Sequence, residues 1–360
     1  MSDSPSLAQV EKVLEQFRDP ETGRSVRQQK QVRDVQLEGN QLRFTLALTS
    51  HSRLLWDETR RELEELLRRE VPGLEQVEIQ LAEHHRPPVR QGQVGVPAKS
   101  VIAVGSGKGG VGKSTVAAVL ATGLQRAGCK VGLLDADVYG PSIPHLLGVN
   151  QRPQVEENRI QPIVVDGLKV MSMGFLVPRG EAVVWRGPML HGALMQFLRD
   201  TQWEELDYLV IDMPPGTGDV ALSLSQLLPL TGAVVVCTPQ DVALLDAEKA
   251  IAMFRKVNIP LLGMIENMSH FVCTQCGTRH EIFGHGGAQA RAKELNVPFL
   301  GEVPLNVAIR IQGDAGQLTG CWQDVQLAEV FQGLCYRLVR EIADRVRQGP
   351  EPPLPQLTVL

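Results

Sequence analysis

The sequence lacks the features that would direct its 360 residues to a membrane, to export or to nucleic acid. No apolar run approaches the roughly 18 residues that a helix needs to span a bilayer. The N-terminus, MSDSPSLAQVEK, has no basic stretch followed by an apolar core, so we expect no secretory signal. A formal net charge of −5 argues against a dominant nucleic-acid surface, which normally requires a basic excess.

Cysteine is scarce as well, with six in the whole chain. Without an export signal, this number favours a reducing compartment over a disulfide framework. An apolar content of 43% with 21% charged residues is typical of a soluble globular protein. We therefore expect a cytoplasmic protein that binds neither membrane nor nucleic acid.

Two regions differ in their hydrophobic patterns. In residues 1–83 two helical patterns and three alternating runs, VRDVQL, LRFTLAL and VEIQLA, predict a small α+β domain. Proline, glycine and polar residues at 84–99 predict a linker. In residues 100–348, runs that are apolar throughout, such as VIAV and AVVVCTP, alternate with helical stretches. They predict an α/β domain with a mainly parallel sheet flanked by helices, and residues 349–360 a Pro-rich tail.

The segment SGKGGVGKST, residues 106–115, meets the phosphate-binding pattern G-x-x-x-x-G-K-[ST] between a predicted strand and a predicted helix. Its glycines let backbone N–H groups turn toward phosphate oxygens, and the helix N-terminus adds its positive end. Lys113 is expected to reach the β- and γ-phosphates, and the Ser114 hydroxyl to ligate Mg²⁺. The predicted nucleotide-binding residues of the loop are Gly107, Lys108, Gly109, Gly110, Val111, Gly112, Lys113, Ser114 and Thr115.

Acidic residues follow two further predicted strands at the same edge of the sheet. LLDADVYGPS places Asp135 and Asp137 there, and LVIDMPPGTGD places Asp212. Asp212 suits a carboxylate that holds Mg²⁺ through water, and Asp137 is the candidate for orienting the attacking water. The segment PPGTGD after Asp212 is expected to sense the γ-phosphate, although Asp219 within it fits a helix cap more readily.

The loop holds one lysine, Lys108, that the phosphate-binding pattern does not need. GKGGVGKS resembles the deviant P-loop of the ParA/MinD/nitrogenase-iron-protein class of ATPases. In that class the early lysine contacts nucleotide phosphates across a dimer interface, so the resemblance implies a homodimer and makes Lys108 catalytic together with Lys113 and Asp137. The alternative is a solvated surface lysine.

Adenine is the expected base. Guanine-specific P-loop proteins use an [NT]-K-x-D motif, and no lysine of this chain has an aspartate two positions on. Asn267, in MIENMS, resembles the adenine-contacting asparagine of the same class. The alternative is an asparagine that only serves a turn.

Cys273 and Cys276 form the only C-x-x-C of the chain. A closed zinc site and a cubane iron–sulfur cluster each want four ligands, and one C-x-x-C provides two. A twofold dimer that brings two pairs to its axis would complete the set. Alternatively, the flanking histidines complete a zinc site within one chain, or the pair is a redox couple. These histidines are His270, His280 and His285.

Seven motifs together resemble the Mrp/ApbC family of iron–sulfur carrier ATPases over nearly the whole chain. They are GKGGVGKST, DADVYGPSIPHLLG, WRGPML, DYLVIDMPPGTGD, TPQDVALLDAEKA, ENMSHFVCTQCG and IFGHGG. The resemblance implies ATP with Mg²⁺, slow hydrolysis, and a labile [4Fe–4S] cluster that Cys273 and Cys276 of two subunits bridge. It also implies upstream scaffold proteins as cluster donors and apo iron–sulfur proteins as acceptors.

The N-terminal region, with DPETGRSV and VRDVQLEGNQLRFTLALTS, resembles the MIP18-type domain that often precedes this ATPase. Such domains often carry a cysteine shortly after LTS, where this chain reads HSRLLW, and no cysteine precedes Cys129. This departure favours a docking or structural role for the region. A second departure lies after the DAG segment, where the resemblance implies a proline and this chain has Gln317 and Leu318. It does not involve the phosphate-binding residues.

Two rival functions remain at this point. A positioning ATPase of the MinD/ParA type would make the C-x-x-C a structural zinc site, and it would need a basic amphipathic end. The C-terminal stretch CYRLVREIADRVRQG is only mildly basic. An electron donor resembling the nitrogenase iron protein would carry its cysteines singly and far apart, which the adjacent pair disfavours.

Overall fold

The computed structural model describes residues 4–138, 140–176, 187–216 and 219–349. The chain divides into two compact units, residues 1–86 with 339–360, and residues 87–338. The final helix, α10 (Val325–Gln348), therefore belongs to both. The sequence assigns residues 339–348 to the second domain. In the structure the end of α10 joins the first unit, because Arg340 and Arg347 form ion pairs with Glu58 and Glu62.

The first unit is a three-stranded sheet with two further helices. Strands β1 and β2 are antiparallel, whereas β2 and β3 are parallel. The alternation in LRFTLAL places Leu42, Phe44 and Leu46 in the core, as a strand with one buried face requires. The elements are α1 (Leu7–Gln16), β1 (Val32–Glu38), β2 (Gln41–Leu48), the short 3₁₀ helix η1 (Ser50–Leu55), α2 (Trp56–Glu70) and β3 (Gln76–Glu83).

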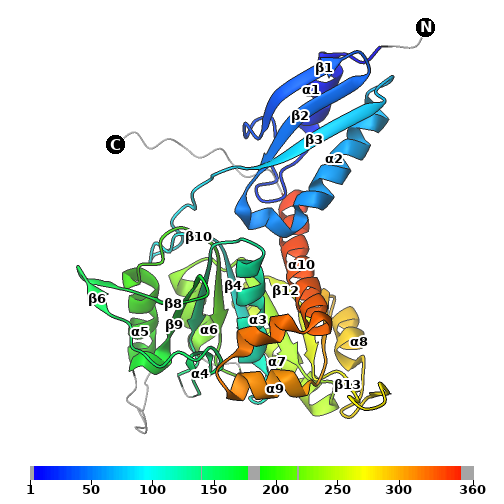
Figure 1. Cartoon of the computed structure of the whole chain (residues 1–360). Helices are drawn as coiled ribbons and strands as arrows, with labels where there is room; N and C mark the ends of the chain where they lie inside the picture. Colours follow the sequence, from blue (N-terminus) through cyan, green and yellow to red (C-terminus); the bar gives the residue numbers. More distant parts are fainter. Residues whose placement is uncertain (1–3, 139, 177–186, 217–218, 350–360) are drawn as a thin grey trace. The chain divides into compact units, whose positions relative to one another are not determined.

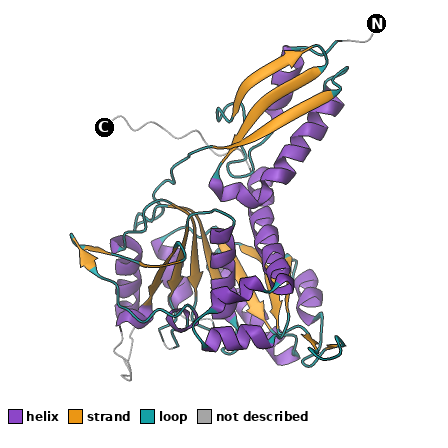
Figure 2. Cartoon of the chain, viewed as in Figure 1, coloured by secondary structure: helices purple, strands orange, loops and turns teal. Residues whose placement is uncertain are grey.

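The second unit is built on an eight-stranded sheet in the order β15-β12-β11-β4-β10-β5-β9-β8 (Figures 1 and 2). Only the pair β8 and β9 is antiparallel, which confirms the predicted mainly parallel sheet. The strands are β4 (Ala98–Gly105), β5 (Val131–Asp135), β8 (Ile163–Val165), β9 (Leu168–Ser172), β10 (Leu206–Asp212), β11 (Gly232–Cys237), β12 (Leu261–Asn267) and β15 (Phe299–Val303).

Helices cover both faces of this sheet, with α3 on one face and α6 and α7 on the other (Figure 1). Side chains of α5 to α8 share one core cluster with the strands. The remaining helices are α3 (Lys113–Arg126), α4 (Ile143–Leu146), α5 (Gly187–Asp200), α6 (Asp219–Leu227), α7 (Asp241–Lys256), α8 (Gly287–Glu294), α9 (Val307–Asp314) and the 3₁₀ helices η2 (Met173–Leu176) and η3 (Leu318–Gln323). No helix among the described residues is long and apolar enough to cross a membrane.

Two antiparallel pairs project from the sheet. The pair β6 (Val155–Glu156) and β7 (Arg159–Ile160) lies between α4 and β8. The pair β13 (Phe271–Val272) and β14 (Arg279–His280) follows β12 and carries both cysteines of the C-x-x-C.

Residues 84–99, predicted as a linker, are partly built into the second unit. Val94 and Val96 are buried in the core of the second unit, and a bridge joins Gln91 to Val96. Strand β4 then begins at Ala98, two residues inside the predicted range. Apolar side chains at alternate positions of a Pro- and Gly-rich stretch are enough to attach it to the core.

Candidate functional site

The phosphate-binding segment lies between β4 and α3, at the carboxyl edge of the sheet. β4 is flanked by β11 and β10, so the segment occupies the middle of this edge. Gly112 is the N-cap of α3 with φ 80°, and no side chain of the described residues caps the helix. The first N–H groups of α3 therefore lack a side-chain acceptor, which is the arrangement that accepts a phosphate.

Lys113, the lysine of the motif, is buried against acidic residues. Its ammonium lies 2.5 Å from Asp212 and 3.9 Å from Asp137, and it donates to the Ser114 hydroxyl at 3.2 Å. The structure thus brings together four predicted residues that are up to 99 positions apart in sequence. A nucleotide phosphate would compete with Asp212 for this ammonium.

Asp212 ends β10 and is fully buried, in register with Asp135 at the end of β5. Burial raises the pKa of Asp212, although Lys113 opposes this. Its Oδ1 atom bonds Lys113, while Oδ2 has no hydrogen-bond partner among the described residues. An unsatisfied buried carboxylate oxygen, with the Ser114 hydroxyl also close to this group, fits a Mg²⁺ site.

Asp135 and Asp137 differ in role, although they lie only two residues apart. Asp135 accepts hydrogen bonds from the Asp137 and Ile143 backbones and from the Ser172 hydroxyl. Burial, and then the charge of Asp212, raise the pKa of Asp135 to about 7. Asp135 therefore holds the loop after β5 in place, whereas Asp137 faces the cavity.

A cavity of about 540 Å³ opens over the phosphate-binding segment. Asp137 lines it, together with most of the predicted loop residues. The predicted residues that line the cavity are Lys108, Gly109, Gly110, Gly112, Lys113, Ser114, Thr115 and Asp137. Its size suits a small ligand, because binding pockets are commonly about 300–1,000 Å³.

Gly107 does not line this cavity, and its role is one of packing. A Cβ atom there would lie 2.0 Å from the Asp246 carbonyl oxygen of α7. Only glycine admits this close approach of two backbone segments. The motif identifies the glycine but not the helix that requires it.

Asn267 and Val111 meet behind the loop. The Asn267 side-chain amide donates to the Val111 carbonyl at 2.8 Å. A Cβ atom added to Gly112 would lie 2.1 Å from the nitrogen of this amide. Asn267 is buried and does not line the cavity, so its geometry is that of a brace for the loop. Its contact with adenine stays a prediction.

Lys108 is half-buried at the edge of the cavity. Among the described residues, no carboxylate lies within 4 Å of its ammonium. The Ser106 hydroxyl donates to its carbonyl, which fixes the backbone and leaves the side chain to face the cavity. Of the segment predicted to sense the γ-phosphate, Thr217 and Gly218 lie outside the described residues.

The two cysteines lie in the turn between β13 and β14. Cys273 N–H donates to the Thr278 carbonyl at 2.9 Å, and Gly277 N–H donates to the Cys273 carbonyl at 2.8 Å. Cys276 is exposed and Cys273 half-buried, and both are free thiols. The Thr278 hydroxyl, 3.2 Å from the Cys276 sulfur, lowers the pKa of that thiol, and the Cys273 thiol contributes in the same direction.

The flanking histidines turn toward carboxylates rather than toward the thiols. His285 lies 2.9 Å from Glu302, and His270 lies 3.8 Å from the same carboxylate. Burial, and then Arg279, lower the pKa of His270. In the part of the chain that the structure describes, neither cysteine belongs to a group of three potential ligand atoms within 4.8 Å. A zinc site completed by these histidines in one chain therefore finds no support.

The N-terminal unit has a buried polar cluster in place of a cysteine. The Glu21 carboxylate accepts from the Thr49 hydroxyl and the Arg86 guanidinium. Asp19 is fully buried and accepts from Gln31 at 2.8 Å. These contacts join segments that are far apart in the sequence, and they give the unit a polar core.

Comparison with known proteins agrees with this geometry. The family model of the NUBPL iron-transfer P-loop NTPases matches residues 97–339, and that of an iron–sulfur cluster assembly protein matches residues 7–81. An iron–sulfur cluster carrier protein of Deinococcus radiodurans is 46% identical over 307 residues, 85% of this chain and 86% of its own. One of Synechocystis is 44% identical over 318 residues, 84% of this chain and 88% of its own.

Two solved structures share the fold of the second unit. The nucleotide-binding protein of Archaeoglobus fulgidus, in complex with ADP and with cobalt, has a TM-score of 0.55 and 42% identity over 61% of this chain and 88% of its own. The cell-division ATPase MinD of Pyrococcus furiosus has a TM-score of 0.50 at 23% identity, over 68% of this chain and 98% of its own. The match over residues 97–339, which is most of the second unit, together with the assembled phosphate site, shows that the chain belongs to the NUBPL family of iron-transfer P-loop NTPases.

Proposed function

We propose that the protein binds ATP with Mg²⁺, hydrolyses it slowly, and carries a labile [4Fe–4S] cluster on a homodimer. It would receive the cluster from a scaffold protein and transfer it to apo iron–sulfur proteins. The relatives named as iron–sulfur cluster carriers support this role, because the similarity extends over most of their length. The bound ADP and the cobalt of the Archaeoglobus protein support nucleotide and metal binding.

The cysteine pair is the observation that carries the proposal. Two neighbouring thiols, one exposed and one half-buried, lie at a turn without a third ligand among the described residues. A [4Fe–4S] cluster takes four cysteine ligands, and two copies related by a twofold axis would supply them. The lowered pKa of Cys276 supports the same role, because the thiolate is the form that binds metal.

The nucleotide site contains residues for each step of hydrolysis. Lys113 and the N–H groups at the start of α3 would bind the phosphates, and Asp137 would orient the attacking water. Ser114 and Asp212 would hold Mg²⁺, which neutralises phosphate charge when it is bound. Lys108 of the partner subunit would complete the site, so that hydrolysis requires the dimer.

An apolar surface supports association with a second copy. Val242 and Leu245 of α7 are 65% and 53% exposed, and Ile282 of the segment after β14 is 56% exposed. The segment containing Ile282 lies against the start of α7, because Cβ positions at Gly284 and Gly287 approach Pro239. Exposed apolar side chains gathered next to the cysteine hairpin suit a protein interface.

Anaerobic reconstitution with iron and sulfide tests the proposal. About four irons and four sulfides per dimer are expected in the wild type. Cys273→Ala and Cys276→Ala should lose them, whereas the buried Cys321→Ala serves as a matched control and should not. The cluster should then pass to an apo-acceptor. One zinc per chain that survives reconstitution would make the hairpin a structural zinc site and refute the carrier role, as would a nucleotide-bound protein that stays monomeric by light scattering.

A further inference from the structure

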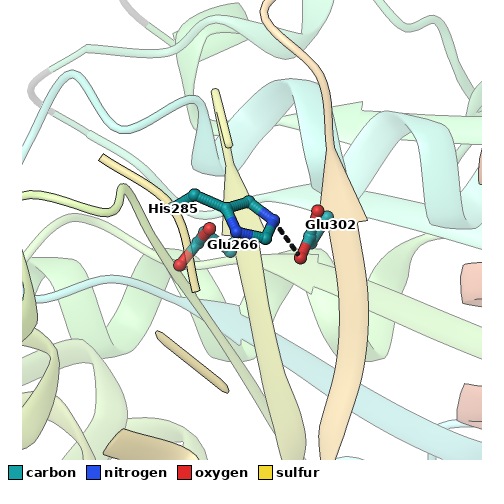
Figure 3. Close-up of side chains that lie close together, drawn as sticks. All are labelled: Glu266, His285 and Glu302. Atoms are coloured by element: carbon teal, nitrogen blue, oxygen red, sulfur yellow. Dashed lines mark ion pairs between the residues drawn. The ribbon is translucent and has the colours of Figure 1, made fainter. Parts of the chain in front are cut away.

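Three metal-ligating side chains meet at the base of the cysteine hairpin, outside the sites described above (Figure 3). Glu266 comes from the end of β12, His285 from the segment before α8, and Glu302 from β15. Their ligand atoms all lie within 4.8 Å of one another. Because β12 and β15 are neighbours in the sheet, the two carboxylates stand on adjacent strands and His285 lies between them.

Glu266 is a fully buried carboxylate. It accepts from the Gly286 N–H at 3.1 Å and the Ala288 N–H at 2.8 Å, and so caps α8, whose N-cap glycine has no side chain to do so. A carboxylate offers about four acceptor positions, so these two bonds leave others open. No side-chain cation of the described residues lies within 4 Å of it. Buried charges are normally paired or bound to metal, and Glu266 has only backbone dipoles.

His285 has the orientation of a metal-bound histidine. Its Nε2 atom lies 2.9 Å from Glu302, and its Nδ1 atom lies 3.7 Å from Glu281. Metal-ligating histidines generally direct the second ring nitrogen to a carboxylate or carbonyl, which fixes the ring. The backbone N–H groups fix the Glu266 carboxylate in the same way.

We propose that Glu266, His285 and Glu302 bind one divalent cation of the Fe²⁺, Co²⁺ or Zn²⁺ type. One imidazole with two carboxylates is a donor set for such cations, whereas Mg²⁺ and Ca²⁺ prefer oxygen ligands alone. The cation would bind between His285 and Glu302, whose facing atoms are 2.9 Å apart. His285 is 30% exposed and Glu302 24% exposed at their side chains, so an ion can enter from solvent.

Arg279 would compete with a bound cation for the Glu302 carboxylate, because its guanidinium lies 3.7 Å from Glu302. Its side chain is 46% exposed, so it can turn into solvent when a cation arrives. His270, 3.8 Å from the same carboxylate, is held by the Ser269 hydroxyl at 2.8 Å and does not block the approach. The cation site shares no residue with the cysteine ligands. The proposed cation site and the proposed function can therefore be refuted separately.

The test uses the full chain with Cys273→Ser and Cys276→Ser, free of tag and nucleotide, and Co²⁺ as the probe. Equilibrium dialysis is expected to give about one Co²⁺ per chain, with an absorption spectrum that lacks thiolate-to-cobalt charge transfer. Adding His285→Gln or Glu302→Gln to this background should weaken binding by about 10- to 100-fold. His280→Gln is the matched control, because His280 is an exposed histidine of the same hairpin outside the cluster.

Two results would overturn the proposal. One is that the Cys273→Ser and Cys276→Ser protein binds no Co²⁺ above the dialysis blank. Another is an affinity that neither His285→Gln nor Glu302→Gln lowers. Circular dichroism of each variant checks that it is folded, and the two substitutions are made separately so that one unstable variant does not decide the outcome.

Discussion

The nucleotide site and the cysteine hairpin are built in opposite ways. The first is assembled from distant residues, since Lys113 meets Asp212 and Asn267 meets Val111 across 99 and 156 positions. The second is held by bonds between Cys273, Gly277 and Thr278, within six residues. The nucleotide site therefore depends on the whole fold, whereas the hairpin keeps its shape locally.

The contrast also concerns what each site still needs. The nucleotide site has a buried ammonium and buried carboxylates in one place, with one carboxylate oxygen unsatisfied. The hairpin has backbone hydrogen bonds within its turn, an exposed Cys276 and a half-buried Cys273. A site of the first kind is changed by removing one charge, and a site of the second kind by adding ligands from outside. The predictions below test this difference.

Lys113→Met should have the largest effect. Loss of the ammonium that binds the phosphates is expected to lower kcat for ATP hydrolysis by about 10²–10³-fold. It should also destabilise the apoprotein by about 3–5 kcal/mol, because Asp212 loses its buried partner. Phosphate release and urea denaturation measure the two effects, with the exposed Lys249→Met as control. Iron bound per hairpin should not change, and a parallel loss there would mean that the two regions are not independent.

Alkylation by iodoacetamide at pH 8 should separate the cysteines by about 100-fold in rate. Burial raises the pKa of Cys237 and Cys335 to about 12, so both remain protonated at this pH. Cys276 has a lowered pKa and should react first, as peptide mass analysis would show.

Thr278→Val should move the pH midpoint of Cys276 alkylation upward, because the hydroxyl that favours the thiolate is removed. The matched control is Thr274→Val, in the same turn. An unchanged midpoint in Thr278→Val would mean that the hydroxyl does not activate the thiol.

Two glycine substitutions should differ by about 2 kcal/mol in the free energy of unfolding. Gly107→Ala would place a Cβ 2.0 Å from the Asp246 carbonyl, and overpacking against backbone costs about 3 kcal/mol. Gly277→Ala has open space around it and a φ of 70°, for which the cost is about 1 kcal/mol. Urea denaturation of both variants provides the comparison, and equal losses would show that α7 yields to the larger side chain.

The last prediction concerns pH. The folded-state pKa of Asp135 is about 7 against 3.8 ordinarily, so the folded protein binds more protons between these values. Stability from this group is therefore greatest below about pH 4, falls as pH rises, and reaches its lowest level above about pH 7. Asp135→Asn should flatten the dependence of unfolding free energy on pH between 5.5 and 8. A slope identical to the wild type would exclude Asp135 as its source.

The sequence predicted the parts of the fold and site whose signals are contiguous. The phosphate-binding motif, the apolar strands and the C-x-x-C each occupy a few consecutive residues, and the structure confirms the parallel sheet they imply. Asp135 and Asp137 could not be told apart, because their difference arises from Ser172 and Ile143 on other segments. Periodicity also missed β15, a five-residue strand that pairing with β12 stabilises.

The cluster of Glu266, His285 and Glu302 was beyond prediction for a related reason. Each residue is an ordinary polar side chain in its own segment, and only the neighbouring positions of β12 and β15 bring them together. His285 was only an alternative zinc ligand beside the thiols, because it is near them in sequence. The carboxylate of Glu302 provides the closer partner in space.

The shared helix α10 has a consequence for how the protein is made. Residues 1–86 leave the ribosome first, but Glu58 and Glu62 find their partners only on residues 340 and 347. The first unit must therefore wait until nearly the whole chain is synthesised before its last ion pairs form. Domains usually fold in the order in which they are translated. Here the first unit emerges first but is among the last parts to be completed. A prematurely terminated chain would therefore lack part of its first unit as well as part of its second.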